Sequence, residues 1–99
     1  MRHALLLLAL TTLGATAQTA DIDAGKAKAA TCTACHGPTG ISSNPEWPNL
    51  AGQQEVYLRK QITAFRDGKR INPLMAPMVK QLTDDDIKNL AAYYASLRE

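Results

Sequence analysis

The segment at residues 31–37, TCTACHG, constrains this chain more than any other. It contains both cysteines of the chain, Cys32 and Cys35, and one of only two histidines, His36, follows directly. Three chemistries use thiols and an imidazole so close together: a dithiol redox switch, a metal site and the covalent attachment of a haem. The rest of the sequence has to distinguish among these three chemistries.

The N-terminal residues have the pattern of a secretory signal peptide. Two basic side chains precede an apolar run at residues 4–13, and Ala15 and Ala17 provide the small side chains of a cleavage site. The run is half as long as the roughly 20 residues that a transmembrane helix needs. We therefore expect residues 1–17 to be removed on export, residues 18–99 to form the mature domain, and no permanent membrane anchor to remain.

The charge pattern does not favour a nucleic-acid partner. The formal net charge is only +2, and the sequence contains no basic stripe with interleaved aromatic residues. The visible basic cluster is Arg66, Lys69 and Arg70, which is typical of a solvated helix end. We expect no binding to nucleic acid.

Three stretches have helical patterns, at about residues 21–32, 54–67 and 83–97. The first is rich in alanine and has acids at its start, where they suit the helix dipole. The second repeats apolar residues at helical spacing. The third begins with Thr83 as N-cap and Asp86 three residues later, an acidic variant of the capping box. We expect a helix over each stretch.

Two loops separate the predicted helices. Residues 37–52 are rich in Gly, Pro, Ser and Asn, and residues 69–81 carry Pro73 and Pro77, which oppose a continuous helix. No run shows convincing strand alternation. The sequence predicts an all-α fold of three main helices and two long loops.

The spacing of the cysteines and His36 favours haem over the two other chemistries. Two thiols three residues apart can reach the vinyl groups on one side of a porphyrin, and the next residue then lies under the iron. A dithiol oxidoreductase usually has a βαβ pattern near its C-x-x-C, and structural zinc normally takes four Cys or His ligands, one more than the mature chain offers. A small domain of about 82 residues also benefits from a bound group. We expect one covalently bound haem.

A methionine can supply the second axial ligand of such an iron. The mature chain has two, Met75 and Met78, both in the proline-bearing loop. A methionine is ordinarily core filler, but a stiff loop far along the chain from His36 can cross the opposite face of a haem. The residues alone leave both methionines as candidates.

The chain resembles class I cytochromes c, in particular the small bacterial periplasmic type and the halves of the diheme cytochrome c4 group. The resemblance rests on CTACHG, on WPNLAGQ at residues 47–53, on MAPM at residues 75–78 and on DIKNLAAYYASL at residues 86–97. It implies the class I cytochrome c fold, with three main helices and two long loops wrapped around one covalently bound haem c.

The resemblance also implies roles for individual residues. Cys32 and Cys35 form the thioethers, and His36 and Met75 are the axial ligands, with Met78 as the alternative. The two further residues implied are Pro48, whose carbonyl accepts a hydrogen bond from the ligand histidine, and Leu50, which packs on the haem. Small side chains at Gly25 and Ala29 let the last helix cross the first closely, with Leu90 and Tyr93 or Tyr94 at the contact.

The function implied by the resemblance is that of a periplasmic one-electron carrier, not an enzyme. Its expected partners are redox proteins such as a membrane reductase complex and a terminal oxidase or reductase. The alternative is a ligand-binding or sensory haem protein in which the methionine is labile. The chain could also act as a subunit of a larger oxidoreductase.

Overall fold

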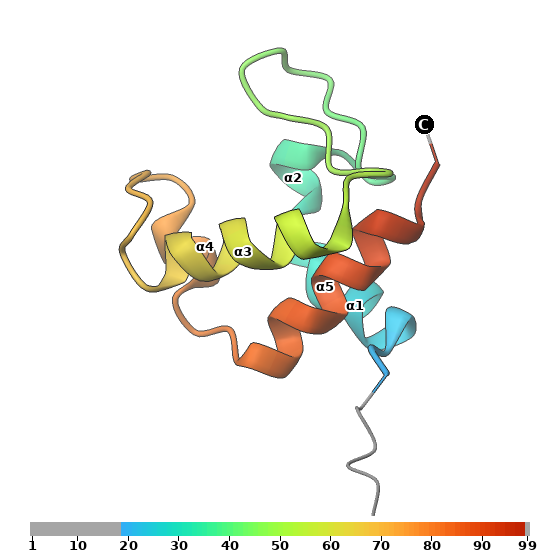
Figure 1. Ribbon diagram of the computed structural model, residues 1–99. Coiled ribbons are helices and arrows are strands. Elements are labelled where there is room, and N and C mark those ends of the chain that lie inside the picture. The colour runs from blue at the N-terminus through green and yellow to red at the C-terminus, as the bar shows by residue number, and fades with distance from the viewer. Residues whose placement is uncertain (1–18, 99) are drawn as a thin grey trace, which may run out of the picture.

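The computed structural model describes residues 19–98, which fold into helices joined by loops (Figure 1). The helical elements are α1 (Ile22–Lys28), the 3₁₀ turn η1 (Ala29–Thr31), α2 (Thr33–His36), α3 (Glu55–Arg66), α4 (Ala76–Val79) and α5 (Asp84–Ser96). Residues 19–98 contain no β-strand. The expected all-α fold of three main helices and two long loops is confirmed. The expected signal peptide at residues 1–17 lies outside the described residues.

No helix within residues 19–98 is both long and apolar enough to cross a membrane.

Helices α1 and α5 cross at Gly25, as the small residues of the first helix predict. A Cβ atom at Gly25 would overlap the backbone carbonyl of Asn89 and would come within 2.9 Å of the Tyr93 Cβ. The Asn89 side chain also accepts a hydrogen bond from the Asp21 backbone N–H at 2.9 Å. The crossing therefore requires glycine, and Tyr93 rather than Tyr94 is the tyrosine at the contact.

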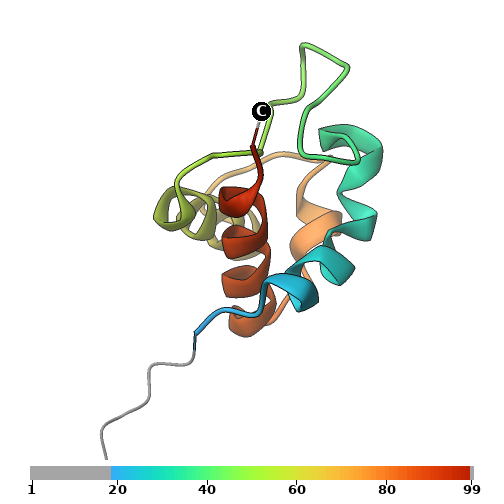
Figure 2. The ribbon, with the colours of Figure 1, turned by 90° about the vertical axis from the view of Figure 1, so that its right-hand side faces the viewer.

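Helix α5 lies between α3 on one side and α1 on the other (Figure 2). Ile87, Leu90 and Tyr94 are its most deeply buried large side chains, each no more than 2% exposed. They pack with Leu58 of α3 and with Val79 of α4. The apolar stripe predicted for the last helix is thus the centre of the core, which stabilises the fold through the burial of apolar surface.

A capping box marks the start of α5, and a glycine with a positive φ follows the end of α3. The Thr83 hydroxyl accepts from the Asp86 N–H at 3.0 Å, and the Asp86 carboxylate accepts from the Thr83 N–H at 3.0 Å, so the predicted capping box is confirmed. Helix α3 ends before Gly68, which takes a φ of +74° that other residues avoid. The predicted helix bounds agree with the structure to within two residues at α3 and α5.

The first predicted helix and the second predicted loop are more divided than expected. Residues 21–32 form α1 and then tighten into η1, and the cysteine segment continues directly as α2. The proline-bearing loop contains the single helical turn α4, with Pro77 in its first turn, where a missing N–H costs nothing. Such short helices show too few residues for a periodic pattern.

Candidate functional site

The cysteine segment forms a helical turn, and its three functional side chains differ in how deeply they are buried. The His36 N–H donates to the Cys32 carbonyl at 3.0 Å, which places these two residues on the same side of α2. His36 is only 8% exposed, Cys32 is half-buried and Cys35 is exposed. Helix α2 ends at Gly37, whose φ of +87° turns the chain away after the histidine.

The histidine is oriented by a hydrogen bond to the loop that follows it, residues 37–54, called here the histidine loop. His36 Nδ1 donates to the Pro48 carbonyl oxygen at 2.8 Å. With a proton on Nδ1, the lone pair of the ring lies on Nε2, the nitrogen that can bind a metal. The hydrogen bond expected from the P-N-L segment is therefore present.

Backbone contacts across the histidine loop hold that carbonyl in place. The Gly40 carbonyl accepts hydrogen bonds from the N–H groups of Leu50 and Ala51, at 2.8 and 3.0 Å. The Asn49 side chain accepts a further one from the Ser42 N–H at 2.7 Å. These bonds join the two ends of the loop directly beside Pro48, so the loop supports the histidine as a rigid unit.

Met75 belongs to a later part of the chain, residues 67–82, called here the methionine segment. The Asn72 side-chain oxygen accepts hydrogen bonds from the N–H groups of Leu74 and Met75, at 2.9 and 3.1 Å. Arg66 donates to the Leu82 carbonyl at 3.1 Å and so fixes the other end of the segment. These hydrogen bonds hold the backbone around Met75.

The two sides meet in one narrow apolar cavity. Its volume is about 320 Å³ including its mouth, and it is lined by Cys32, His36, Leu50, Ile62, Met75, Val79, Leu82, Leu90 and Tyr94. A thiol, an imidazole nitrogen and a thioether therefore face a space whose other walls are mostly hydrocarbon. These are the donor types that a c-type haem requires, in the dry surroundings that suit it. The residues present fit a covalently bound haem.

The two methionines differ in their relation to this cavity. Met75 is partly buried and lines it, whereas Met78 is 47% exposed and does not line it. Cys35 is also absent from the lining residues and is exposed, although its neighbour His36 lines the cavity. The structure thus gathers Cys32, His36, Leu50 and Met75 at one place, and Pro48 contributes through its carbonyl.

The cavity also affects the acid–base properties of Cys32 and Tyr94. Burial raises the pKa of the Cys32 thiol, because a thiolate would be poorly solvated there. Burial likewise raises the pKa of the Tyr94 phenol strongly, and the neighbouring Cys32 adds to this effect. Both groups are therefore neutral at physiological pH in the protein without a haem.

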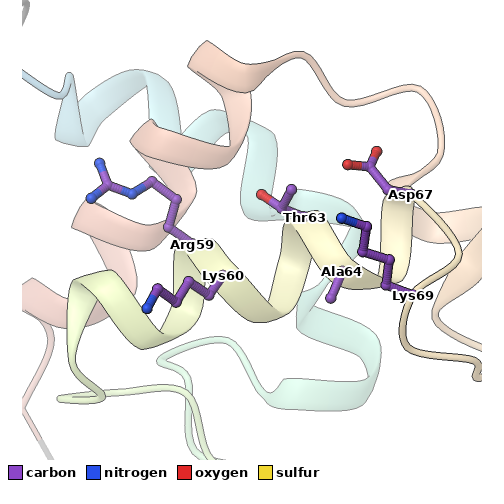
Figure 3. Close-up of a pocket in the computed structure, with 6 residues that line it drawn as sticks. All are labelled: Arg59, Lys60, Thr63, Ala64, Asp67 and Lys69. Atoms are coloured by element: carbon purple, nitrogen blue, oxygen red, sulfur yellow. The ribbon is translucent and has the colours of Figure 1, made fainter.

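A wider hollow on the outer face of α3 has a different chemistry (Figure 3). Its volume is about 510 Å³ including its open mouth, and it is lined by Arg59, Lys60, Thr63, Ala64, Asp67 and Lys69. All six residues belong to α3 or directly follow it, and none is a cysteine, histidine or methionine. Of these residues, Asp67 forms an ion pair with Arg66 at 2.9 Å, so its negative charge is already balanced. The charged side chains along α3 and just after it are typical of a solvated helix face.

Sequence reasoning did not identify several walls of the cavity. Ile62, Val79 and Leu82 line it, and so does Tyr94, which we expected only as a member of the apolar stripe or at the helix crossing. The spacing of Leu90 and Tyr94, four residues apart on α5, is the signal that places them on one face. The sequence does not show which face of α5 points at the cysteines.

Comparison with known proteins agrees with this geometry. Residues 22–98 match the family model described as cytochrome c. Cytochrome c4 of Pseudomonas aeruginosa is 47% identical over 91 residues, covering 92% of this chain and 45% of that protein. Cytochrome c-554(548) of Halomonas halodenitrificans is 48% identical over 79 residues, covering 77% of this chain and 95% of that protein.

A solved structure extends the agreement to the fold. The reduced recombinant cytochrome c4 from Pseudomonas stutzeri superposes with a TM-score of 0.76 at 39% identity, covering 80% of this chain and 46% of that one. The chain spans about half the length of the cytochrome c4 proteins that it matches and nearly all of cytochrome c-554(548). The chain therefore belongs to the cytochrome c family and carries one covalently bound haem c.

Proposed function

We propose that residues 18–99, after export and removal of residues 1–17, act as a periplasmic one-electron carrier with a single haem. The observation that carries this proposal is that His36 and Met75, which lie far apart in the sequence, line the same apolar cavity. The chain thereby offers a ligand for each axial position of an iron bound there. The sequence pattern of the first residues supports the periplasmic location.

Each donor has a separate task in this proposal. Cys32 and Cys35 attach the haem through thioethers, and His36 binds the iron through Nε2 while Pro48 holds the ring in orientation. Met75 supplies the second axial ligand, and a thioether there raises the reduction potential. Leu50 packs against the haem as one of the apolar walls.

The filled axial positions explain why we propose a carrier rather than an enzyme. When bound, the haem supplies a one-electron couple at its iron. His36 and Met75 leave no position at the iron where a substrate could bind, and the apolar walls exclude water. The protein thus changes little between its two redox states, which suits rapid electron exchange.

Exposed apolar side chains next to Met75 support docking to redox proteins. Ile71 is 90% exposed, Leu74 64% and Met78 47%, all within the methionine segment. Contacts of this kind suit small, transient interfaces. We propose a membrane reductase complex as the electron donor and a terminal oxidase or reductase as the acceptor.

The exported protein provides the test. Intact mass should show one added haem and the loss of residues 1–17, and the absorption spectra should show reversible reduction. The reduced protein should not bind carbon monoxide rapidly. A product without haem mass would refute the proposal, and rapid carbon monoxide binding by the native protein would favour a ligand-binding or sensory role instead.

A further inference from the structure

Tyr94 has a buried hydroxyl group without a partner. The side chain is 2% exposed, and its oxygen makes no hydrogen bond to any of the described residues. Buried tyrosine hydroxyls usually find a hydrogen-bond partner, because desolvation without one is unfavourable. An orphaned hydroxyl in a well-packed core therefore points to a hydrogen bond that forms only when the neighbouring cavity is filled.

The position of this hydroxyl relates it to the haem site. Tyr94 lines the cavity together with Cys32, His36 and Met75. The remaining lining residues are hydrocarbon and offer no acceptor, and the His36 Nδ1 proton is already donated to Pro48. His36 Nε2 and the Met75 sulfur are the proposed ligands of the iron, so neither remains free to accept a hydrogen bond from Tyr94. Among the side chains that line the cavity, this leaves the sulfur of Cys32 as the acceptor.

We propose that in the haem-loaded protein the Tyr94 hydroxyl donates a hydrogen bond to the thioether sulfur of Cys32 and thereby raises the reduction potential. The inference rests on the proposed attachment of the haem at Cys32. A thioether sulfur is a weak acceptor, but in a dry cavity it is a better partner than none. Tyr94 acts as a positioning residue, because it reaches the haem only through Cys32.

The direction of the effect follows from the O–H dipole. A donor aimed at the attached sulfur presents its positive end to the haem and withdraws electron density from it. This favours the state with one more electron, the reduced state. Hydrogen bonds and burial around a haem are among the means by which a protein sets its potential.

Tyr94→Phe removes the hydroxyl and keeps the ring, so it tests the proposal directly. Tyr93→Phe is the matched control, since Tyr93 is adjacent on α5 and buried but does not line the cavity. Both variants should carry one haem by intact mass and retain the wild-type ligand spectrum. The reduction potential of Tyr94→Phe should shift downward, while that of Tyr93→Phe stays at the wild-type value.

A second measurement needs no variant. In the reduced wild-type protein, proton NMR should show a slowly exchanging Tyr94 hydroxyl proton with a cross-relaxation signal to the β-protons of Cys32. The proposal is overturned if Tyr94→Phe keeps the wild-type potential, or if the hydroxyl proton contacts water instead of Cys32. Failure of the wild-type protein to carry haem at Cys32 would refute the proposed function instead, and intact mass separates the two cases.

Discussion

The two sides of the cavity are built in different ways. On the histidine side, the side chain of the candidate ligand is itself hydrogen-bonded, because His36 Nδ1 donates to the Pro48 carbonyl at 2.8 Å. The histidine loop is held in turn by the hydrogen bonds from the Leu50 and Ala51 N–H groups to the Gly40 carbonyl. On the methionine side, backbone N–H groups donate to the Asn72 side-chain oxygen and Arg66 donates to the Leu82 carbonyl, whereas packing positions the Met75 side chain. The side chain of Ile71 in this segment is almost fully exposed.

This difference predicts how the two proposed axial ligands behave. His36 is held by its ring hydrogen bond to Pro48 and, in the proposed function, by haem attachment just before it, so it should stay bound under mild conditions. The methionine depends on the packing of an exposed segment with a single helical turn, α4. Regions with few buried contacts open most easily, so we expect the methionine segment to open before the histidine loop does.

The largest effect is expected from removing the anchor on the histidine side. Cys32→Ala combined with Cys35→Ala should leave no covalent haem and a largely unfolded chain, because a domain this small depends on its bound group for much of its core. Intact mass and far-ultraviolet circular dichroism measure both outcomes. Thr33→Ala, within the same helix, should load haem normally, and a well-folded double variant would contradict the account.

A smaller effect is expected from replacing one glycine on each side of the cavity with alanine. At Gly37, after the histidine, φ is +87° and a Cβ would overlap the Ile41 backbone, so Gly37→Ala should cost more than the ~1–3 kcal/mol of a strained φ alone. At Gly68, before the methionine, φ is +74° but a Cβ would meet nothing within 4 Å. Gly68→Ala should cost about 1–2 kcal/mol. Denaturant unfolding of the oxidised holoprotein gives both values, and equal losses would remove the distinction between the two sides.

The smallest effect is expected at the start of α5, where the methionine segment joins the core. The pKa of the Asp86 carboxyl lies below its ordinary value, mainly because it accepts a hydrogen bond from the Thr83 backbone N–H. This stabilisation is present above an unfolded-state pKa of about 4 and is lost as the pH falls through the lower folded-state pKa. Thr83→Ala should cost about 1 kcal/mol near neutral pH.

The pH dependence separates this cap from general acid denaturation. Asp86→Asn should lower stability at neutral pH and should show a smaller further loss than the wild type as the medium is acidified below about pH 4. Asp85→Asn is the control, because Asp85 pairs with Lys88 at the surface, at 3.4 Å, and is not a member of the capping box. If both variants lost stability with the same pH profile as the wild type, the capping box would not contribute as described.

The sequence predicted the parts of the site that depend on short-range spacing. Cys32, Cys35 and His36 lie within one helical turn. Pro48 was predicted from the resemblance of its P-N-L segment to class I cytochromes c. The walls Ile62, Val79, Leu82 and Tyr94 were not predicted as one set, because they meet only after three helices have packed. The rotation of a helix about its axis is set by tertiary contacts and not by its own pattern.

Adjacent residues with similar chemistry show the same limit. Tyr93 and Tyr94 were equal candidates for the helix crossing, and the packing of α1 against α5 decides between them: Tyr93 meets Gly25 and Tyr94 lines the cavity. Short helices are a second limit. Residues 33–36 and 76–79 form single turns that are stabilised by their surroundings, so no periodic pattern in the sequence predicts them.

The central claim is that Met75, and not Met78, faces His36 across the haem. The most direct measurement is the absorption spectrum of the oxidised holoprotein, in which iron–sulfur ligation produces a long-wavelength charge-transfer band, recorded with its reduction potential. Met75→Ala should abolish the band and lower the potential, whereas Met78→Ala should leave both nearly unchanged. Loss of the band in Met78→Ala with its retention in Met75→Ala would contradict the account.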